Sequence, residues 1–109
     1  MSHGKYQSCI RACYDCAIEC DHCAIACLQE EKVKEMARCI ELDMYCADAC
    51  RLAASFMSRG DEFARRVCSF CAEICEECGK ECNMHHMDHC KICAEACYKC
   101  AMECRSMAA

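Results

Sequence analysis

The spacing of the cysteines is the feature that most constrains the fold of this chain. Residues 13–27 read CYDCAIECDHCAIAC, in which five cysteines follow one another at steps of 3, 4, 3 and 4. Such steps average about 3.5 residues, the period of the helical side chains that face the core of a bundle. A half-buried strand requires a period of two, which these residues lack. The spacing therefore predicts a helix that buries a stripe of thiols.

The same pattern recurs in four groups that together contain all 19 cysteines. The first, third and fourth groups alternate steps of 3 and 4, whereas the second steps by 7 and 4, with Asp43 in the skipped position. In chain order the groups are Cys9, Cys13, Cys16, Cys20, Cys23 and Cys27; Cys39, Cys46 and Cys50; Cys68, Cys71, Cys75, Cys78 and Cys82; and Cys90, Cys93, Cys97, Cys100 and Cys104.

Four groups of this kind predict four helices. We expect them near residues 5–28, 32–58, 61–82 and 87–106. Between the second and third, Gly60 followed by Asp61 predicts a helix stop and then an N-cap. Connections this short place neighbouring helices antiparallel, so the prediction is an all-α, up-down-up-down four-helix bundle with a cysteine-lined core. The length suits a single domain over residues 1–109.

The composition supports this fold. The absence of Pro and the presence of only 3 Gly favour helices. Because the chain has 3 Phe and no Trp, its 19 Cys and 8 Met must fill much of the core. A protonated thiol can do so, since it packs like a small hydrophobic group.

Charge and hydropathy exclude several partners. The net charge is −5 and no basic cluster or set of stacking aromatic residues is present, which argues against a nucleic-acid partner. No apolar run is long enough to cross a membrane, and the first residues, MSHGKYQSC, contain no leader-like apolar segment. We therefore expect a cytoplasmic protein without a membrane partner. In a reducing cytosol the thiols stay free or bind metal.

The thiols favour a soft monovalent ion. Eight C-x3-C pairs each place two cysteines on one helix face, with Cβ atoms about 5–6 Å apart. Thiolates select Cu(I), and one monovalent ion per thiolate leaves a buried core neutral. The leading function is therefore the storage of many Cu(I) ions, roughly one per cysteine.

Other functions remain open at this point. Zn(II) would be neutral at about one ion per two thiolates, but it prefers closed tetrahedral sites, so a buffer of divalent metals is the main alternative. An iron–sulfur protein is the third, although the C-x2-C-x2-C run of ferredoxins is absent. Plain core packing and a reservoir of disulfides fit reactive thiols at i and i+4 less well. The sequence shows no Ser/His/Asp set and no phosphate loop, so we expect no enzymatic activity.

These inward C-x3-C pairs, repeated from Cys9 to Cys104 on four predicted helices, closely resemble the bacterial copper storage proteins. The resemblance implies a bundle that stores many Cu(I) ions on thiolates along its core. It also implies a homotetramer, and its leaderless members act in the cytosol. The chain departs from the pattern in the second helix, where Asp43 stands in a thiol position.

Antiparallel threading predicts which residues share an end of the bundle. The 28–32 and 83–87 connections lie together. The opposite end gathers a plug of hydrocarbon side chains, namely Phe56, Met57, Phe63, Val67 and Met107. The first end gathers imidazole and thioether groups that can pass Cu(I) inward. The candidate ligands added to the 19 cysteines are Met36, Asp43, His85, His86 and His89.

Each of these added residues has a plainer interpretation. The histidines can be solvated surface residues, and Met36 can be core filler. Asp43 can accept hydrogen bonds from thiols, mark a loosely packed level, or face solvent on a rotated helix. Outside the cysteine seam, the second helix carries further apolar residues, which suggests packing between subunits. They are Ile40, Met44, Leu52 and Phe56.

Overall fold

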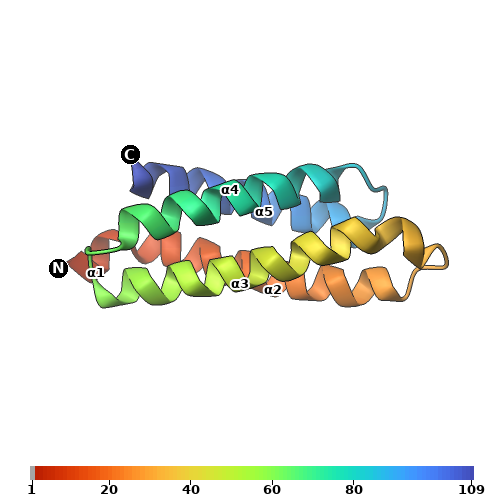
Figure 1. Ribbon diagram of the computed structural model, residues 1–109, viewed down its shortest axis with the longest axis horizontal. Coiled ribbons are helices and arrows are strands. Elements are labelled where there is room, and N and C mark those ends of the chain that lie inside the picture. The colour runs from red at the N-terminus through yellow and green to blue at the C-terminus, as the bar shows by residue number, and fades with distance from the viewer. Residues whose placement is uncertain (1) are drawn as a thin grey trace.

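Four long α-helices form the molecule, which measures 48 × 19 × 17 Å (Figure 1). The computed structural model describes residues 2–109. The elements are α1 (Ser2–Lys5), α2 (Gln7–Leu28), the 3₁₀ turn η1 (Val33–Met36), α3 (Ala37–Arg59), α4 (Ala64–Asn83) and α5 (Asp88–Ala108).

The four-helix bundle is the predicted one. Helix α2 packs against α3 and α5, and α4 packs against the same two helices. Consecutive long helices run antiparallel, so both termini lie at one end together with the α3–α4 connection (Figure 1). The α2–α3 and α4–α5 connections lie at the other end. The four predicted helices are confirmed, with boundaries that differ by a few residues.

The α3–α4 connection differs in one detail from the prediction. Gly60 ends α3 with φ 131°, a left-handed conformation that favours glycine, so the predicted helix stop is confirmed. Asp61 is not the N-cap of the next helix, because α4 begins at Ala64 and its N-cap position is Phe63. The Asp61 carboxylate instead accepts a 2.6 Å hydrogen bond from the Tyr6 hydroxyl. A contact with a distant residue thus replaces the local cap.

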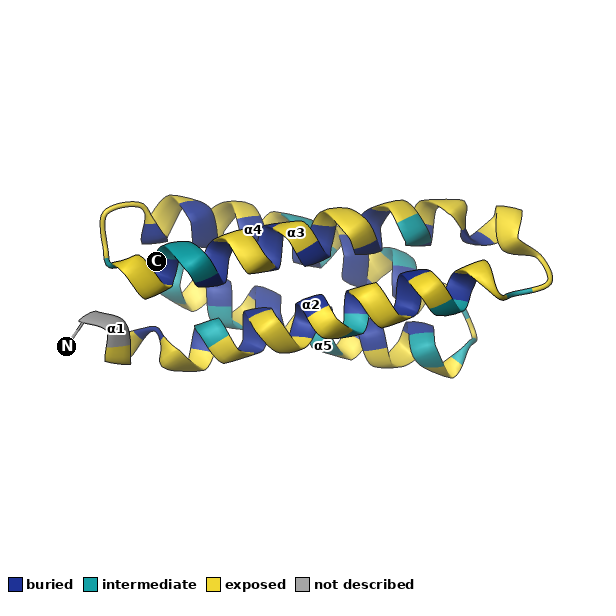
Figure 2. Cartoon of the chain, turned by 90° about the horizontal axis from the view of Figure 1, so that it is seen from below, coloured by how far each residue is buried: buried dark blue, intermediate teal, exposed yellow. Residues whose placement is uncertain are grey.

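Small side chains let the helices approach closely. Every cysteine is buried with at most 1% of its surface exposed, and rows of buried alanines flank the thiols on each helix. Figure 2 shows the buried residues along the inner faces of the helices. Several large apolar side chains lie outside instead, including Ile18, Tyr45 and Met102. The core therefore consists mainly of sulfur and methyl groups.

No helix within residues 2–109 has the length and low polarity needed to span a lipid bilayer.

We expect the metal-free, reduced chain to be folded. All 19 cysteines are free and buried, and a neutral thiol contributes to a core as a small apolar group. Circular dichroism of the reduced chain should therefore show high helicity that changes little when metal is added. A disordered spectrum that becomes helical only with metal, as in a zinc finger, would contradict a preformed bundle.

Candidate metal centre

The thiols form a column along the bundle axis. Sulfur atoms of different helices lie within 4 Å of one another from one end to the other. The Sγ atoms of Cys9 and Cys104 are 3.6 Å apart near the termini, and those of Cys39 and Cys82 are 3.5 Å apart near the other end. In the middle, Cys46 Sγ lies 3.6 Å from Cys75 Sγ. The helices thus supply one shared set of sulfur atoms.

Pairs at i and i+4 also meet within a helix, as the spacing predicts. Their Sγ–Sγ distances range from 3.8 Å to 4.0 Å. The pairs in contact are Cys16/Cys20, Cys23/Cys27, Cys46/Cys50, Cys71/Cys75 and Cys78/Cys82. Contacts between helices are as short or shorter, down to 3.5 Å for Cys39 and Cys82, so neighbouring helices complete each group.

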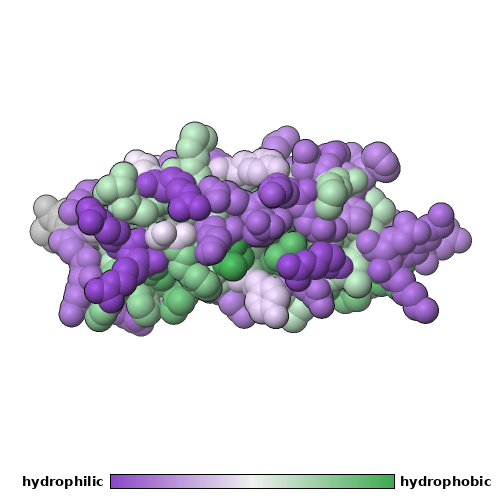
Figure 3. Space-filling model, turned by 45° about the horizontal axis from the view of Figure 1, so that its top comes forward, coloured by the Kyte–Doolittle hydropathy of each residue, from purple (hydrophilic) through white to green (hydrophobic). Residues whose placement is uncertain are grey.

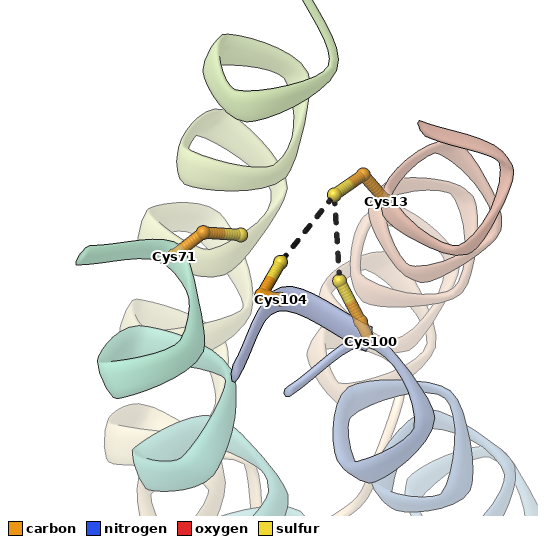
Figure 4. A group of neighbouring side chains, drawn as sticks. All are labelled: Cys13, Cys71, Cys100 and Cys104. Carbon is orange, nitrogen blue, oxygen red and sulfur yellow. Dashed lines mark hydrogen bonds between the residues drawn. The ribbon is translucent and has the colours of Figure 1, made fainter. Parts of the chain in front are cut away.

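Groups of four sulfur atoms recur along the column, each with all atoms within 4.8 Å of one another. Figure 4 shows one such group, in which α2 contributes Cys13, α4 contributes Cys71, and α5 contributes Cys100 and Cys104. Cys13 Sγ lies 3.6 Å from Cys100 Sγ and 3.8 Å from Cys104 Sγ. Three helices therefore converge on a volume the size of one or two ions.

These distances suit several coordination geometries. With a metal–sulfur bond of about 2.3 Å, two thiolates of one ion lie about 3.8 Å apart in a tetrahedral site, about 4.0 Å in a trigonal one and about 4.6 Å in a linear one. The observed contacts of 3.5–4.0 Å and the 4.8 Å limit of the groups cover all three. The distances alone therefore do not select the metal. The charge of the filled core is the property that distinguishes one metal from another.

Burial opposes ionisation of the metal-free thiols, because a charged sulfur loses its hydration there. Desolvation, together with the neighbouring Cys39 sulfur, raises the pKa of Cys90 to about 11. Desolvation likewise raises the pKa of Cys27. At these two positions, loss of the proton is favoured when a cation takes its place. Each bound ion must therefore balance the protons that it displaces.

Asp43 lies inside the column and completes it. Its side chain is fully buried, and Oδ1 accepts hydrogen bonds from the thiols of Cys78, Cys82 and Cys93 at 3.3, 3.4 and 3.4 Å. Cys39 donates a longer one to Oδ2 at 3.9 Å. The predicted role as an acceptor of thiol hydrogen bonds is confirmed, and the solvent-facing alternative is wrong. Burial is the largest cause that raises the pKa of Asp43 to about 10.

Of the three candidate histidines, His89 is the one that reaches the thiols. Its Nδ1 lies 3.5 Å from Cys90 Sγ and 3.6 Å from Cys23 Sγ. Its Nε2 lies 2.9 Å from Glu30 Oε2, which holds the ring in place. Glu30 was not among the sequence candidates, because its partner lies 59 positions away in the chain.

The other candidates surround a pocket of about 380 Å³ at the same end. His85, His86 and Met36 line it. His85 pairs with Glu81 at 3.0 Å, whereas His86 is exposed. Met36 is buried beneath the pocket with 1% of its surface exposed. The structure thus brings the predicted residues to one mouth of the bundle, with different access to the column.

The opposite end is closed partly as expected. The Phe56 and Phe63 rings lie 6.1 Å apart, but Phe63 is 48% exposed, so this pair covers the end from outside. Buried Tyr6, Met57 and Val67 fill the interior. The end also contains a sulfur atom that sequence reasoning assigned to hydrocarbon packing, since Met57 Sδ lies 3.5 Å from Cys68 Sγ.

Comparison with known proteins identifies the family. The family model described as copper storage protein matches residues 2–109 of the chain. The chain belongs to the copper storage protein family. A cysteine-rich protein of Bacillus subtilis (strain 168), YhjQ, is 48% identical over 103 residues, which cover 94% of this chain and 95% of that relative.

Solved structures of family members superpose closely. The Cu(I)-bound copper storage protein BsCsp3 is 48% identical, with a TM-score of 0.91 over 95% of this chain and 98% of that chain. A cytosolic copper storage protein from Streptomyces lividans, described with five coppers, is 38% identical, with a TM-score of 0.93 over 98% of this chain and 94% of that chain. The same protein has also been solved with 10 copper equivalents.

The sequence and the sulfur–sulfur distances are compatible with more than one metal, and family membership decides in favour of copper. This copper storage protein binds many Cu(I) ions through its buried thiolates and is a metal store, as the sequence predicts. It is not an enzyme.

The buried carboxyl group predicts a pH-dependent stability of the metal-free store. The raised pKa means that folded Asp43 keeps a proton that the unfolded chain releases above about pH 4. The free energy of unfolding should fall as pH rises from about 5 to about 8, by at most about 1.4 kcal/mol per pH unit from this group. Asp43→Asn should remove that slope, because the amide carries no titrating proton.

Thermal unfolding of the reduced chain at several pH values measures this effect. Asp48→Asn is the matched control, since Asp48 lies on the same helix and is exposed. Equal slopes for the two variants would show that Asp43 is already ionised in the folded chain.

Proposed function

We propose that this chain stores Cu(I) in the cytosol at about one ion for each of its 19 cysteines. The observation that carries the proposal is the continuous column of buried, free thiols. Neighbouring groups of four share members, such as Cys16 and Cys46, which occur together in two groups. A thiolate shared in this way can bridge two ions, so all cysteines can take part in one extended cluster.

Charge balance sets the proposed capacity. The column is closed to solvent, and unpaired charge in such a volume is unfavourable by many kcal/mol. Exchange of one thiol proton for one Cu(I) leaves the net charge of the core unchanged. Each Zn(II) would balance two thiolates, so a neutral core could hold only about one Zn(II) for every two cysteines. A core filled at one Zn(II) per cysteine would carry a large positive charge. Cu(I) is therefore the ion with which the whole column can be filled.

The histidine mouth is the proposed route of uptake. His85, His86 and Met36 line its pocket. His89 contacts Glu30, which also lines that pocket, through one ring nitrogen and the thiols of Cys23 and Cys90 through the other. Imidazole and thioether groups are softer ligands than water and bind copper without adding charge. An ion can thus move from the surface to the column through a series of neutral ligands.

Localisation and assembly complete the proposal. The S. lividans relative is described as cytosolic, which supports a cytosolic store. Large apolar side chains remain exposed on the long helices, among them Ile18 and Ile25 on α2 and Met44 and Leu52 on α3. Figure 3 shows such apolar surface in patches among hydrophilic side chains. These patches support a homotetramer.

Sedimentation equilibrium measures the assembly directly, and a monomer at micromolar concentration would exclude it.

Titration of the reduced, metal-free chain with Cu(I) tests the capacity. We expect thiolate-to-copper charge-transfer absorption to rise up to about 19 ions per chain, from one cation per thiolate. Zn(II) is the comparison ion, and we expect it to stop near half the thiol count with lower affinity. Saturation at about four Cu(I) or fewer would end the storage proposal.

Replacement of the three mouth histidines tests the route. A variant with His85→Ala, His86→Ala and His89→Ala should take Cu(I) from a competing chelator several-fold more slowly. Its capacity should fall only slightly, because most ligands are thiolates deeper in the column. Stopped-flow transfer compares it with His22→Ala, a control on the exposed side of α2. Loading at the wild-type rate would show that the three histidines are ordinary surface residues.

A further inference from the structure

The row of seam positions on α3 does not stop at its last cysteine. After Cys50 the 3/4 spacing continues through Ala53 to Met57, and both residues are fully buried. Met57 therefore occupies the position that a thiol would take one level further along the column. Its Sδ lies 3.5 Å from Cys68 Sγ, within the range of the thiol–thiol contacts elsewhere in the core.

The surroundings of Cys68 make this contact distinctive. The Cys68 thiol donates a hydrogen bond to Met57 Sδ. Cys9 and Cys104, whose Sγ atoms are 3.6 Å apart, also lie near enough to affect the pKa of Cys68. The end of the column thus consists of three thiols and one thioether from all four long helices.

A column of bridged ions has a particular requirement at each end. An ion in the middle has thiolates on both sides, whereas the last ion has them on one side only. A further thiolate would add an unbalanced negative charge, so a neutral soft ligand suits the last position. At the histidine mouth the imidazole of His89 can meet this requirement, since its Nδ1 lies 3.5 Å from Cys90 Sγ.

We propose that Met57 is a copper ligand, and that its thioether and the Cys68 thiolate hold the last Cu(I) at the end opposite the histidine mouth. Cys9 or Cys104 supplies a further thiolate, which bridges this ion to the next Cu(I) and has already lost its own proton to that neighbouring ion. On binding, the Cys68 S–H bond breaks, its proton leaves to solvent, and an S–Cu bond forms, so the net charge is unchanged. The inference rests on the proposed function, because it assigns one site within that store.

Access to this site differs from access to the mouth. The Tyr6 ring is buried over the end of the bundle, and its hydroxyl is bonded to Asp61 at 2.6 Å. Val67, also buried, fills the space beside it. The pocket of about 370 Å³ outside Tyr6 is not lined by imidazole or thiol groups. We therefore expect an ion held by Met57 to leave through the column and to be among the last removed.

The most direct test is a crystal structure of the saturated wild-type chain, with copper located by anomalous scattering. We expect an ion at about 2.3 Å from Met57 Sδ, the usual length of a metal–sulfur bond. A fully loaded structure with no ion within bonding distance of this sulfur would overturn the proposal. This measurement needs no variant, so it is independent of effects on folding.

A variant pair tests the function of the thioether in solution. Met57→Leu keeps the volume of the side chain and removes the sulfur. Met102→Leu is the control, because Met102 is 70% exposed. After treatment of the loaded proteins with a limiting Cu(I) chelator, the Met57 variant should retain one ion fewer per chain than wild type, and the control should retain the same number. Equal retention in all three would assign Met57 to packing alone.

The possible results also distinguish a failure of the Met57 inference from a failure of the storage proposal. If the wild-type chain itself takes up only a few ions, the storage proposal fails whatever Met57 does. If capacity is high and only the ion at Met57 is missing, the store stands and this inference fails. Circular dichroism of the metal-free Met57 variant confirms that the comparison is made between folded proteins.

Discussion

The burial of ionisable thiols in a core without water is the constraint on which the rest of this structure depends. All 19 cysteines have at most 1% of their surface exposed, so each sulfur must carry either a proton or a metal cation. Replacement of a proton by Cu(I) leaves the charge of the core unchanged. The same helical bundle can therefore hold the thiols in both states, and storage requires no refolding. Asp43 obeys the same rule, since burial raises its pKa to about 10 and keeps the carboxyl group neutral.

The burial of so many thiols also requires small side chains beside them. Sulfur atoms 3.5–4.0 Å apart require four helices that approach closely, and alanines beside the thiols permit that approach. Many large apolar residues consequently lie on the outside, where Ile18 is 62% and Met44 60% exposed. This distribution reverses the usual bundle, in which leucine and isoleucine fill the core. The apolar exterior is then available for the contacts between subunits that we propose. The thiols that bind metal and the apolar residues proposed for assembly thus lie on opposite faces of each helix.

The two ends of the column differ in their surroundings, but each places the same kind of ligand next to the last thiols. Each end places a neutral donor beside the last thiols, the imidazole of His89 at one and the thioether of Met57 at the other. Both ends carry a surface pocket, of about 380 Å³ at the histidines and about 370 Å³ beside Tyr6 and Asp61, but only the first is lined by imidazole groups. With uptake at the histidine end, as we propose, the store would fill and empty in order along its axis. The acidic partners Glu30 and Glu81 hold two of the histidines at that end.

The sequence by itself determined the helices, their antiparallel order and the sulfur-lined core, because a 3/4 spacing of cysteines is a local property that only one face of a helix satisfies. It also placed His85, His86 and His89 at one mouth, since short connections leave little freedom of threading. Only the tertiary structure decided which of them touches the thiols, how Asp43 is bonded, and that Asp61 binds Tyr6 instead of capping α4. It also showed that Met57 continues the sulfur column at Cys68. These features depend on contacts between residues far apart in the chain, such as Glu30 and His89, which are 59 positions apart. Spacing along the chain shows which face of a helix turns inward, but it does not show which distant residues meet there.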